Sequence, residues 1–132
     1  MERQPSKTVL VVDDDRVFVS RLTAALSACG YNVIDSQDVR QAYALLDNRT
    51  VDLAVIDLNL PDKSGLELIH TTAKTCKSTR ILAISAVLSD LHLDIAKYMG
   101  ADEAIRKFSY SVAEPFPAHE WQTVVADLFE RV

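Results

Sequence analysis

The most constraining feature of this sequence is that short apolar runs of strand length alternate with longer stretches of helical periodicity. The runs are rich in β-branched residues and bounded by polar ones, as is typical of strands buried on both faces. Strands that alternate with helices predict a parallel sheet, because each crossover returns the chain to the same edge. Right-handed crossovers then place helices on both faces. We therefore predict an α/β fold with a doubly wound, five-stranded parallel sheet of the (βα)5 type.

The element ranges follow from where each pattern starts and stops. Strands are predicted over residues 8–12, 31–34, 53–57, 81–85 and 104–107. Helices are predicted over residues 17–29, 39–46, 65–76, 91–99 and 119–132. Apolar spacing predicts the buried helix faces, with Val17, Leu22, Ala25, Leu26 and Cys29 in the first helix and Trp121, Val124, Val125, Leu128 and Phe129 in the last.

Length, charge and cysteine spacing limit the class of protein. The chain has 132 residues, the size of one domain, and a net charge of −5. That charge disfavours direct binding to nucleic acid or to an anionic membrane, since both need clustered Lys and Arg. Residues 1–7 are polar, and no apolar run approaches the ~20 residues of a membrane span. Cys29 and Cys76 form no CxxC pair, so we expect reduced thiols in a single cytoplasmic domain.

Reactive side chains follow four of the predicted strands. They are Asp13, Asp14 and Asp15 after the first strand, Asp57 at the end of the third, Ser85 at the end of the fourth and Lys107 near the end of the fifth. Because the carboxyl ends of parallel strands meet at one edge, these groups are expected to lie close together. Crowded carboxylates repel unless a cation neutralises them, and Mg²⁺ takes carboxylate, water and phosphate oxygens as ligands. With an amine and a hydroxyl, such a site resembles a phosphoryl-transfer centre in which one carboxylate is the nucleophile.

Each of these residues also has an ordinary structural explanation. An acidic cluster after a strand often caps the next helix, and either Asp14 or Asp15 is a candidate N-cap. Asp57 alone would suit a turn, Ser85 a cap and Lys107 a solvated charge. Their coincidence at four strand ends favours a functional site over four unrelated structural roles.

The same residues resemble the receiver domains of two-component response regulators, of the chemotaxis-regulator type, over most of the chain. The family's acidic pair corresponds to VVDDD (11–15), and its phosphoacceptor segment to DLAVIDLNLPDKSGLEL (52–68). The switch hydroxyl corresponds to ILAISA (81–86), and the family's lysine ends GADEAIRK (100–107). The resemblance implies a flavodoxin-like fold with strand order 2-1-3-4-5.

The resemblance further implies which residues accept phosphate and hold the metal. Asp57 would accept a phosphoryl group from a histidine kinase or a histidine phosphotransfer protein. Asp14 and Asp57 would bind Mg²⁺ directly, Asp13 would act through water, and the backbone carbonyl of Asn59 would complete the protein ligands.

The remaining implied roles concern catalysis and output. Ser85 and Lys107 would contact the phosphoryl oxygens, and with Asp57 they make up the predicted catalytic set. Asn59 and Val87 stand where the family tunes the rate of autodephosphorylation. The family is a signalling switch whose only chemistry is its own phosphorylation and dephosphorylation, so we do not predict an enzyme in the wider sense. A downstream protein of unknown identity would bind the face formed by the fourth helix, fifth strand and fifth helix.

Two departures from the family pattern concern that output face. Ala104 stands where the family has an aromatic residue in the fifth strand, and Phe108 follows Lys107 where the family has proline. The segment Glu114-Pro115-Phe116 resembles the displaced lysine–proline–phenylalanine motif, so a competing alignment puts Glu114 in the place of the lysine. That alignment would place an anion where phosphate must bind.

The predicted layout is one receiver domain over 1–132, with a core at 7–107, an insertion at 108–118 and a C-terminal helix at 119–132. A second hypothesis is a pseudo-receiver, a protein-binding scaffold that needs no phosphorylation, motivated by Ala104 and the missing lysine–proline pair. A third, a flavodoxin-like cofactor binder, is disfavoured because acids replace the Gly, Ser and Thr loop that a flavin phosphate needs. The phosphorylation switch is our prediction.

Overall fold

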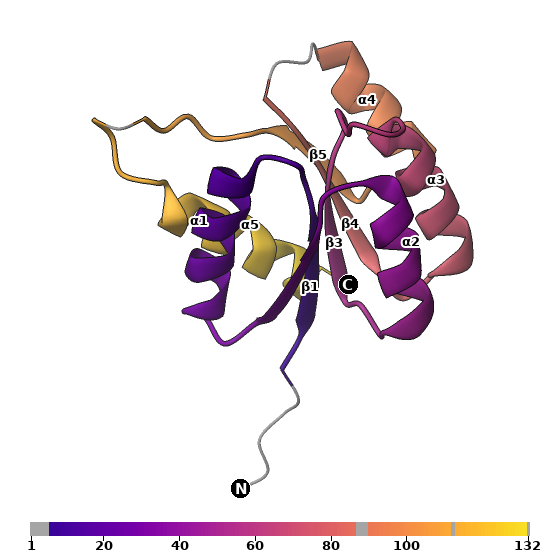
Figure 1. The fold of residues 1–132 in the computed structure, drawn as a ribbon, viewed down its shortest axis with the longest axis horizontal. Coiled ribbons are helices and arrows are strands. Elements are labelled where there is room, and N and C mark those ends of the chain that lie inside the picture. The colour runs from indigo at the N-terminus through magenta and orange to yellow at the C-terminus, as the bar shows by residue number, and fades with distance from the viewer. Residues whose placement is uncertain (1–5, 87–89, 112, 132) are drawn as a thin grey trace, which may run out of the picture.

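The structure is a computed structural model that describes residues 6–86, 90–111 and 113–131. Strands and helices alternate along this part of the chain (Figure 1). The strands are β1 (Thr8–Val12), β2 (Asn32–Ser36), β3 (Leu53–Asp57), β4 (Arg80–Ser85) and β5 (Glu103–Arg106). The helices are α1 (Arg16–Ser27), α2 (Val39–Asn48), α3 (Gly65–Thr75), α4 (Asp90–Met99) and α5 (Ala118–Glu130). The predicted (βα)5 pattern is confirmed, with boundaries that differ by at most two residues.

All five strands pair in parallel in the order β2-β1-β3-β4-β5, as predicted. The chain steps outward from β1 to β2 and then returns past β1 to β3, so the direction of winding reverses between β1 and β3. Such a reversal opens a crevice at the carboxyl ends of the strands. Val12 pairs with Ile56, which places Asp13 and Asp57 level with each other at this edge.

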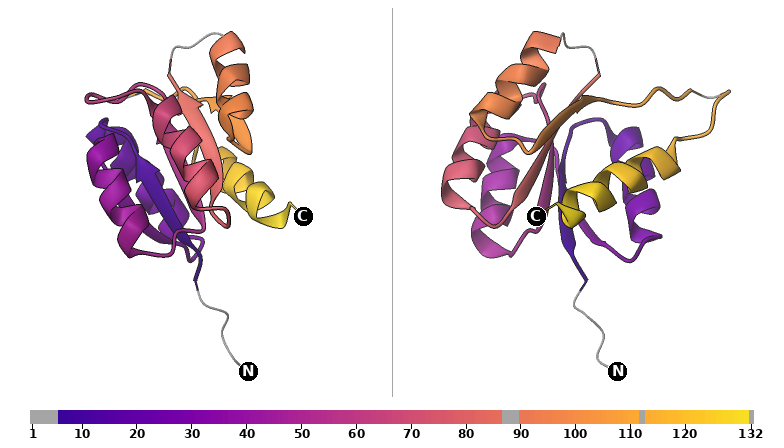
Figure 2. Two further views of the ribbon diagram at one scale, coloured as in Figure 1. Left: turned by 90° about the vertical axis from the view of Figure 1, so that its right-hand side faces the viewer. Right: turned by 180° about the vertical axis from the view of Figure 1, so that it is seen from behind.

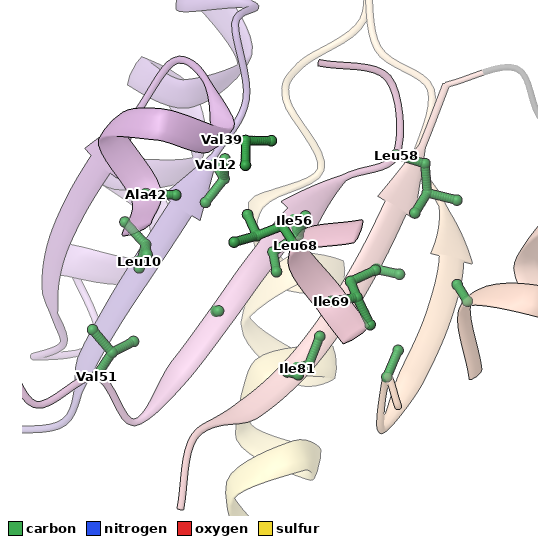
Figure 3. Packing of buried hydrophobic residues seen from close by; sticks show 14 residues of the cluster. Leu10, Val12, Val39, Ala42, Val51, Ile56, Leu58, Leu68, Ile69 and Ile81 are labelled. Carbon is green, nitrogen blue, oxygen red and sulfur yellow. The ribbon is translucent and has the colours of Figure 1, made fainter. Parts of the chain in front are cut away.

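Helices cover both faces of the sheet (Figure 2). On one face, residues of α2, α3 and α4 pack against the strands in a cluster that includes Leu10, Val12, Val39, Ala42, Ile56, Leu68, Ile69 and Ala96 (Figure 3). On the other face, α1 and α5 form a second cluster that includes Val9, Val11, Phe18, Leu22, Leu26, Trp121, Val125 and Leu128. Successive strand residues point to opposite faces, so the continuous apolar run of β1 contributes to both clusters.

The predicted buried face of the first helix is wrong at two positions. Val17 is 58% exposed, and Cys29 lies beyond the end of α1 and is exposed. The helix instead buries Phe18, Val19, Leu22, Ala25 and Leu26. Phe18, Leu22 and Ala25 follow four- and three-residue steps, and Val17 stands outside that row because one residue turns a helix by about 100°. Apolar character alone did not distinguish the two rows.

The stretch that follows β5 has no helix or strand in its described residues until α5 begins at Ala118. Its aromatic side chains pack against the α1 and α5 side of the molecule. The ring centroids of Phe108 and Trp121 lie 5.0 Å apart, as do those of Tyr110 and Phe116. Figure 1 shows this stretch running out from β5 past α1 before the chain turns back into α5.

No helix in the described part of the chain has the length and apolar character needed to cross a membrane.

Candidate functional site

Three carboxylates meet at the carboxyl edge of the sheet. Asp57 is the last residue of β3, and Asp13 directly follows β1, the neighbouring strand. Asp13 is fully buried and Asp57 is 6% exposed, whereas Asp14 is exposed. One carboxylate oxygen from each of the three residues lies within 4.8 Å of the other two. The structure therefore brings together the three acids that were predicted as metal ligands.

Hydrogen bonds fix the turn after β1. The backbone N–H of Asp13 donates to the carbonyl oxygen of Ser36 at the end of β2 (3.0 Å). The N–H of Asp15 donates to Oδ1 of Asp13 (2.9 Å), and Oδ1 of Asp15 accepts from the N–H of Phe18 (3.1 Å). Asp15 is therefore the N-cap of α1, and Asp14 is not. The carboxylate of Asp14 stays with the other acids at the edge of the sheet.

Lys107 supplies the amine of the site. Its backbone N–H donates to the carbonyl oxygen of Ser85 at the end of β4 (2.8 Å). Its Nζ lies 2.7 Å from Oδ2 of Asp13 and 3.6 Å from Oδ2 of Asp57, and its side chain is 13% exposed. Burial acts to lower the pKa of Lys107, but the nearby carboxylate of Asp13 outweighs it and raises the pKa above the ordinary value. The amine is therefore positively charged at neutral pH.

The carboxyl group of Asp57 is shifted toward its protonated form. Burial raises its pKa most, the N–H of Asn59 (3.0 Å from Oδ1) lowers it, and the charge of Asp13 raises it again. Lys107 lowers it by less, and the resulting pKa is about 6. A nearby cation would favour the ionised form. The carboxylate oxygens of the three acids lie close together, and the single charge of Lys107 does not balance them. Such a set of oxygen atoms fits a hard divalent cation such as Mg²⁺.

The loop after β3 is held close to the backbone of the acid. The N–H of Gly65 donates to the carbonyl oxygen of Leu58 (3.1 Å), and Asn59 forms a bridge with Ser64, the N-cap of α3. A Cβ at position 65 would lie 2.1 Å from the carbonyl oxygen of Asp57. Only glycine fits at this close approach.

Asp62 ties the same loop to a second helix. Its carboxylate oxygens accept the backbone N–H groups of Val39 (3.0 Å) and Arg40 (3.2 Å), at the start of α2. These hydrogen bonds, the one from Val39 first, hold the pKa of Asp62 below its ordinary value. The sequence carried no signal for this contact, because the two segments are more than 20 residues apart.

The other predicted site residues lie at the places that the topology requires. Ser85 is fully buried at the end of β4 and follows Ile84, which pairs with Asp57 across the sheet. Asn59 is exposed and touches Asp57 through its N–H. Val87 lies outside the described residues.

A groove of about 780 Å³ adjoins the site on the side of α1. The first turns of α1 and the stretch after β5 form its walls, with Asp15, Arg21, Lys107, Tyr110, Glu114 and Phe116 among the lining residues. Glu114 is exposed there, while Lys107 contacts the acids. The structure therefore supports the alignment in which Lys107 is the family's lysine and disfavours the competing one.

Phe18 is a site residue that the sequence analysis missed. Its ring centroid lies 4.3 Å from Nζ of Lys107, within the range of a cation–π contact. The two residues are distant in sequence, and the pattern along the first helix assigned Phe18 no role.

Ala104 lies on the face of the sheet that α4 covers. It pairs with Ala83 and packs against the cluster on that face. The neighbouring helix α4 exposes three large apolar side chains, with Leu91 65%, Ile95 36% and Tyr98 90% exposed.

The fold is that of a flavodoxin-like α/β protein, and its crevice of acids and lysine is a candidate cation site. The crevice lies at the carboxyl edge of the sheet, where the direction of winding reverses between β1 and β3. The chain belongs to the response regulator receiver domain family, whose model matches residues 9–111. It is thus a protein of two-component signal transduction, as the sequence motifs predicted.

Named relatives agree with this assignment. The transcriptional regulatory protein CpxR of Klebsiella pneumoniae subsp. pneumoniae (strain HS11286) is 35% identical over 99 residues, 75% of this chain and 42% of that protein. The photosynthetic apparatus regulatory protein RegA of Rhodobacter capsulatus is 31% identical over 101 residues, 76% of this chain and 55% of that protein. The chain therefore spans only about half, or less, of the length of these relatives.

Solved structures share the fold over nearly the whole chain. A CheY-like receiver domain protein from Methanospirillum hungatei JF-1 has a TM-score of 0.82 and 25% identity, with 96% of each chain covered. A response regulator protein from Burkholderia pseudomallei, described with a phosphorylated aspartic acid, calcium ion and citrate, has a TM-score of 0.75 and 29% identity. That match covers 96% of this chain and 76% of the other.

Proposed function

We propose that this receiver domain accepts a phosphoryl group on Asp57 and thereby switches its interactions with other proteins. The observation that carries the proposal is the environment of Asp57: a buried carboxylate with Asp13 and Asp14 beside it and the amine of Lys107 at 3.6 Å. A related structure is described with a phosphorylated aspartic acid and a calcium ion, which supports the same chemistry here.

Asp14, Asp57 and the backbone carbonyl of Asn59 are the proposed direct ligands of Mg²⁺, and Asp13 is proposed to hold the cation through water. When bound, the cation would offset the negative charge of the acids and of the phosphoryl oxygens. The N–H of Asn59 already holds Oδ1 of Asp57, which leaves Oδ2, on the side of Lys107, as the proposed nucleophile. The burial of Asp13 and Asp57 limits the access of water that would hydrolyse the product.

The proposed donor is a phosphohistidine on a histidine kinase or a histidine phosphotransfer protein. Oδ2 of Asp57 forms the new P–O bond while the P–N bond of the donor breaks. The donor nitrogen keeps the electron pair, and the ring leaves as neutral imidazole when its other nitrogen carries a proton. Lys107 and Ser85 would bind the phosphoryl oxygens as charge redistributes over them. Asn59 and Val87 would set how quickly water removes the phosphate.

The proposed output is a change in protein binding, not catalysis on another substrate. The face built from α4, β5 and α5 is the proposed contact for the downstream protein, and the apolar side chains of Leu91, Ile95 and Tyr98 on α4 suit such a contact. Direct binding of nucleic acid or of a membrane by these residues is not part of the proposal, because the net charge is −5. The proposed site of action is the cytoplasm.

Intact-mass measurement after incubation with a small phosphodonor and Mg²⁺ tests this function. We expect a phosphate-sized mass gain in the wild type and in Asp47→Asn, an exposed aspartate on α2, but none in Asp57→Asn. The gain should disappear when a chelator removes Mg²⁺. If the wild type gains no mass with any phosphodonor while it still binds Mg²⁺, the phosphorylation-independent scaffold replaces the switch.

A further inference from the structure

The ammonium group of Lys107 has neighbours on two sides. The carboxylates of Asp13 and Asp57 lie on one side, at 2.7 Å and 3.6 Å. The ring of Phe18 lies beneath the ammonium, with its centroid at 4.3 Å. Lys107 also lines the groove beside α1, so the open groove is the direction in which its flexible side chain can leave the acids.

Phe18 is itself held firmly. It is 1% exposed, and its ring packs edge-on against Trp121 (centroids 5.4 Å, planes 66°) and at a tilt against Phe116 (6.2 Å, 53°). Its backbone N–H is bound by the N-cap Asp15, whose own N–H is bound by Asp13. Hydrogen bonds therefore connect the backbone of Phe18 to the turn that holds Asp13 and Asp15. The ring cannot turn away from Lys107 without losing its packing against Trp121 and Phe116.

We propose that Phe18 is a positioning residue for the phosphorylation reaction, because its aromatic face holds the ammonium of Lys107 against the acid pocket. This inference rests on the proposed function. The ring supplies the face of a π system, whose negative quadrupole attracts a cation. A saturated side chain of similar size would fill the space without this attraction, and the ammonium would spend more time in the groove.

The expected consequence is a slower phosphorylation of Asp57. A cation–π contact at a largely buried site is strong enough to change the equilibrium constant between the positioned and the displaced lysine by about three- to tenfold. The rate constant for phosphorylation should fall by up to the same factor, because an ammonium in the groove does not help to neutralise the incoming phosphoryl oxygens. Mg²⁺ affinity should not fall, because an ammonium that spends more time in the groove competes less with the cation for the carboxylates of Asp13 and Asp57.

The test compares rate constants for the phosphate mass gain in the full chain, with acetyl phosphate and saturating Mg²⁺. The variants are Phe18→Leu and a protein with pentafluorophenylalanine at position 18, which keeps the shape of the ring but reverses its quadrupole. Phe129→Leu is the matched control, because Phe129 packs on Tyr31 (centroids 5.4 Å) away from Lys107. Melting temperatures establish that each variant is folded at the assay temperature.

A second arm measures Phe18→Leu in a Lys107→Met background. We expect both ring variants to be slower than the wild type, by up to about tenfold, and the control to keep the wild-type rate. Phe18→Leu should have no further effect in the protein that lacks the lysine. The fluorinated protein remains informative if Phe18→Leu fails to fold.

A wild-type rate in the fluorinated protein would overturn the inference, and so would an undiminished effect of Phe18→Leu in the Lys107→Met background. A wild type that gains no phosphate from any phosphodonor refutes the proposed function itself, and this inference falls with it.

Discussion

Replacement of Gly65 by alanine places a methyl group against the backbone that carries the phosphoacceptor. The new Cβ would lie 2.1 Å from the carbonyl oxygen of Asp57 and 2.9 Å from Cα of Leu58. Contacts of this kind are essentially never shorter than 3.0 Å, so the two segments must separate by about 0.9 Å. Both sides of the contact are backbone, and no side-chain rotation relieves it.

The energetic cost combines three effects. Overpacking of a buried site costs about 1–3 kcal/mol. The hydrogen bond from the N–H of Gly65 to the carbonyl oxygen of Leu58 (3.1 Å) lengthens, at about 1 kcal/mol. Alanine gains up to about 1 kcal/mol over glycine in a helix, which offsets part of this loss. With the full offset from alanine, we expect a net loss of about 1–3 kcal/mol, or a fall in melting temperature of roughly 3–12 °C.

Urea denaturation measures the loss in stability, and a calorimetric Mg²⁺ titration measures the effect on the site. Weaker Mg²⁺ binding is expected, because the displaced backbone carries both Asp57 and Asn59. Gly30→Ala is the matched control: its φ is +90° and nothing lies within 4 Å of the added Cβ, so it costs about 1–2 kcal/mol of backbone strain without changing Mg²⁺ affinity. A Gly65→Ala protein with wild-type stability and wild-type Mg²⁺ affinity would refute the steric reasoning.

Two further predictions concern protonation and the opposite edge of the sheet. Asp57 has a pKa of about 6 in the folded protein without Mg²⁺, against an ordinary value of 3.8. The folded state therefore binds more protons than the unfolded state between these values, and the free energy of unfolding should fall by about 3 kcal/mol as pH rises through them. Asp57→Asn should remove this pH dependence. Mg²⁺ should raise the melting temperature of the wild type more at pH 7.5 than at pH 5. Equal rises at the two pH values would contradict the assignment of the raised pKa to Asp57. Asp52→Ala should cost about 1–2 kcal/mol in urea denaturation, because Oδ2 of Asp52 accepts the N–H of Thr8 (2.8 Å). Its phosphorylation rate should equal that of the wild type, since this contact lies at the amino ends of the strands, and a slower rate would show that the two edges are coupled.

The stretch after β5 packs aromatic side chains beside the acidic site. Phe108 and Phe116 pack against the α1 and α5 side, and the stretch forms one wall of the groove beside the acids. The residue that follows Lys107 therefore joins an aromatic cluster in place of the proline of the family pattern. The ammonium of Lys107 touches this cluster through the ring of Phe18, which packs against Phe116.

The sequence by itself determined the layered α/β fold and the edge on which the acids meet. Alternating apolar runs and helical periods permit few arrangements other than a parallel sheet with helices on both faces. Asp13 directly follows β1 and Asp57 ends β3, and the strand order that the family resemblance implied makes these two strands neighbours. The motifs around Asp57 and Lys107 were also sufficient to predict the family.

Only the tertiary structure decided which neighbours shape the site. Two of these contacts join segments that are far apart in sequence: Phe18 with Lys107, and Asp62 with the backbone N–H groups of α2. A third, the close approach of Gly65 to the backbone of Asp57, depends on a separation of a few ångströms. The exposure of Val17 was likewise decided by the packing of α1 against α5, not by its apolar side chain. Such contacts arise from how complete elements pack, and no local spacing of residue types encodes them.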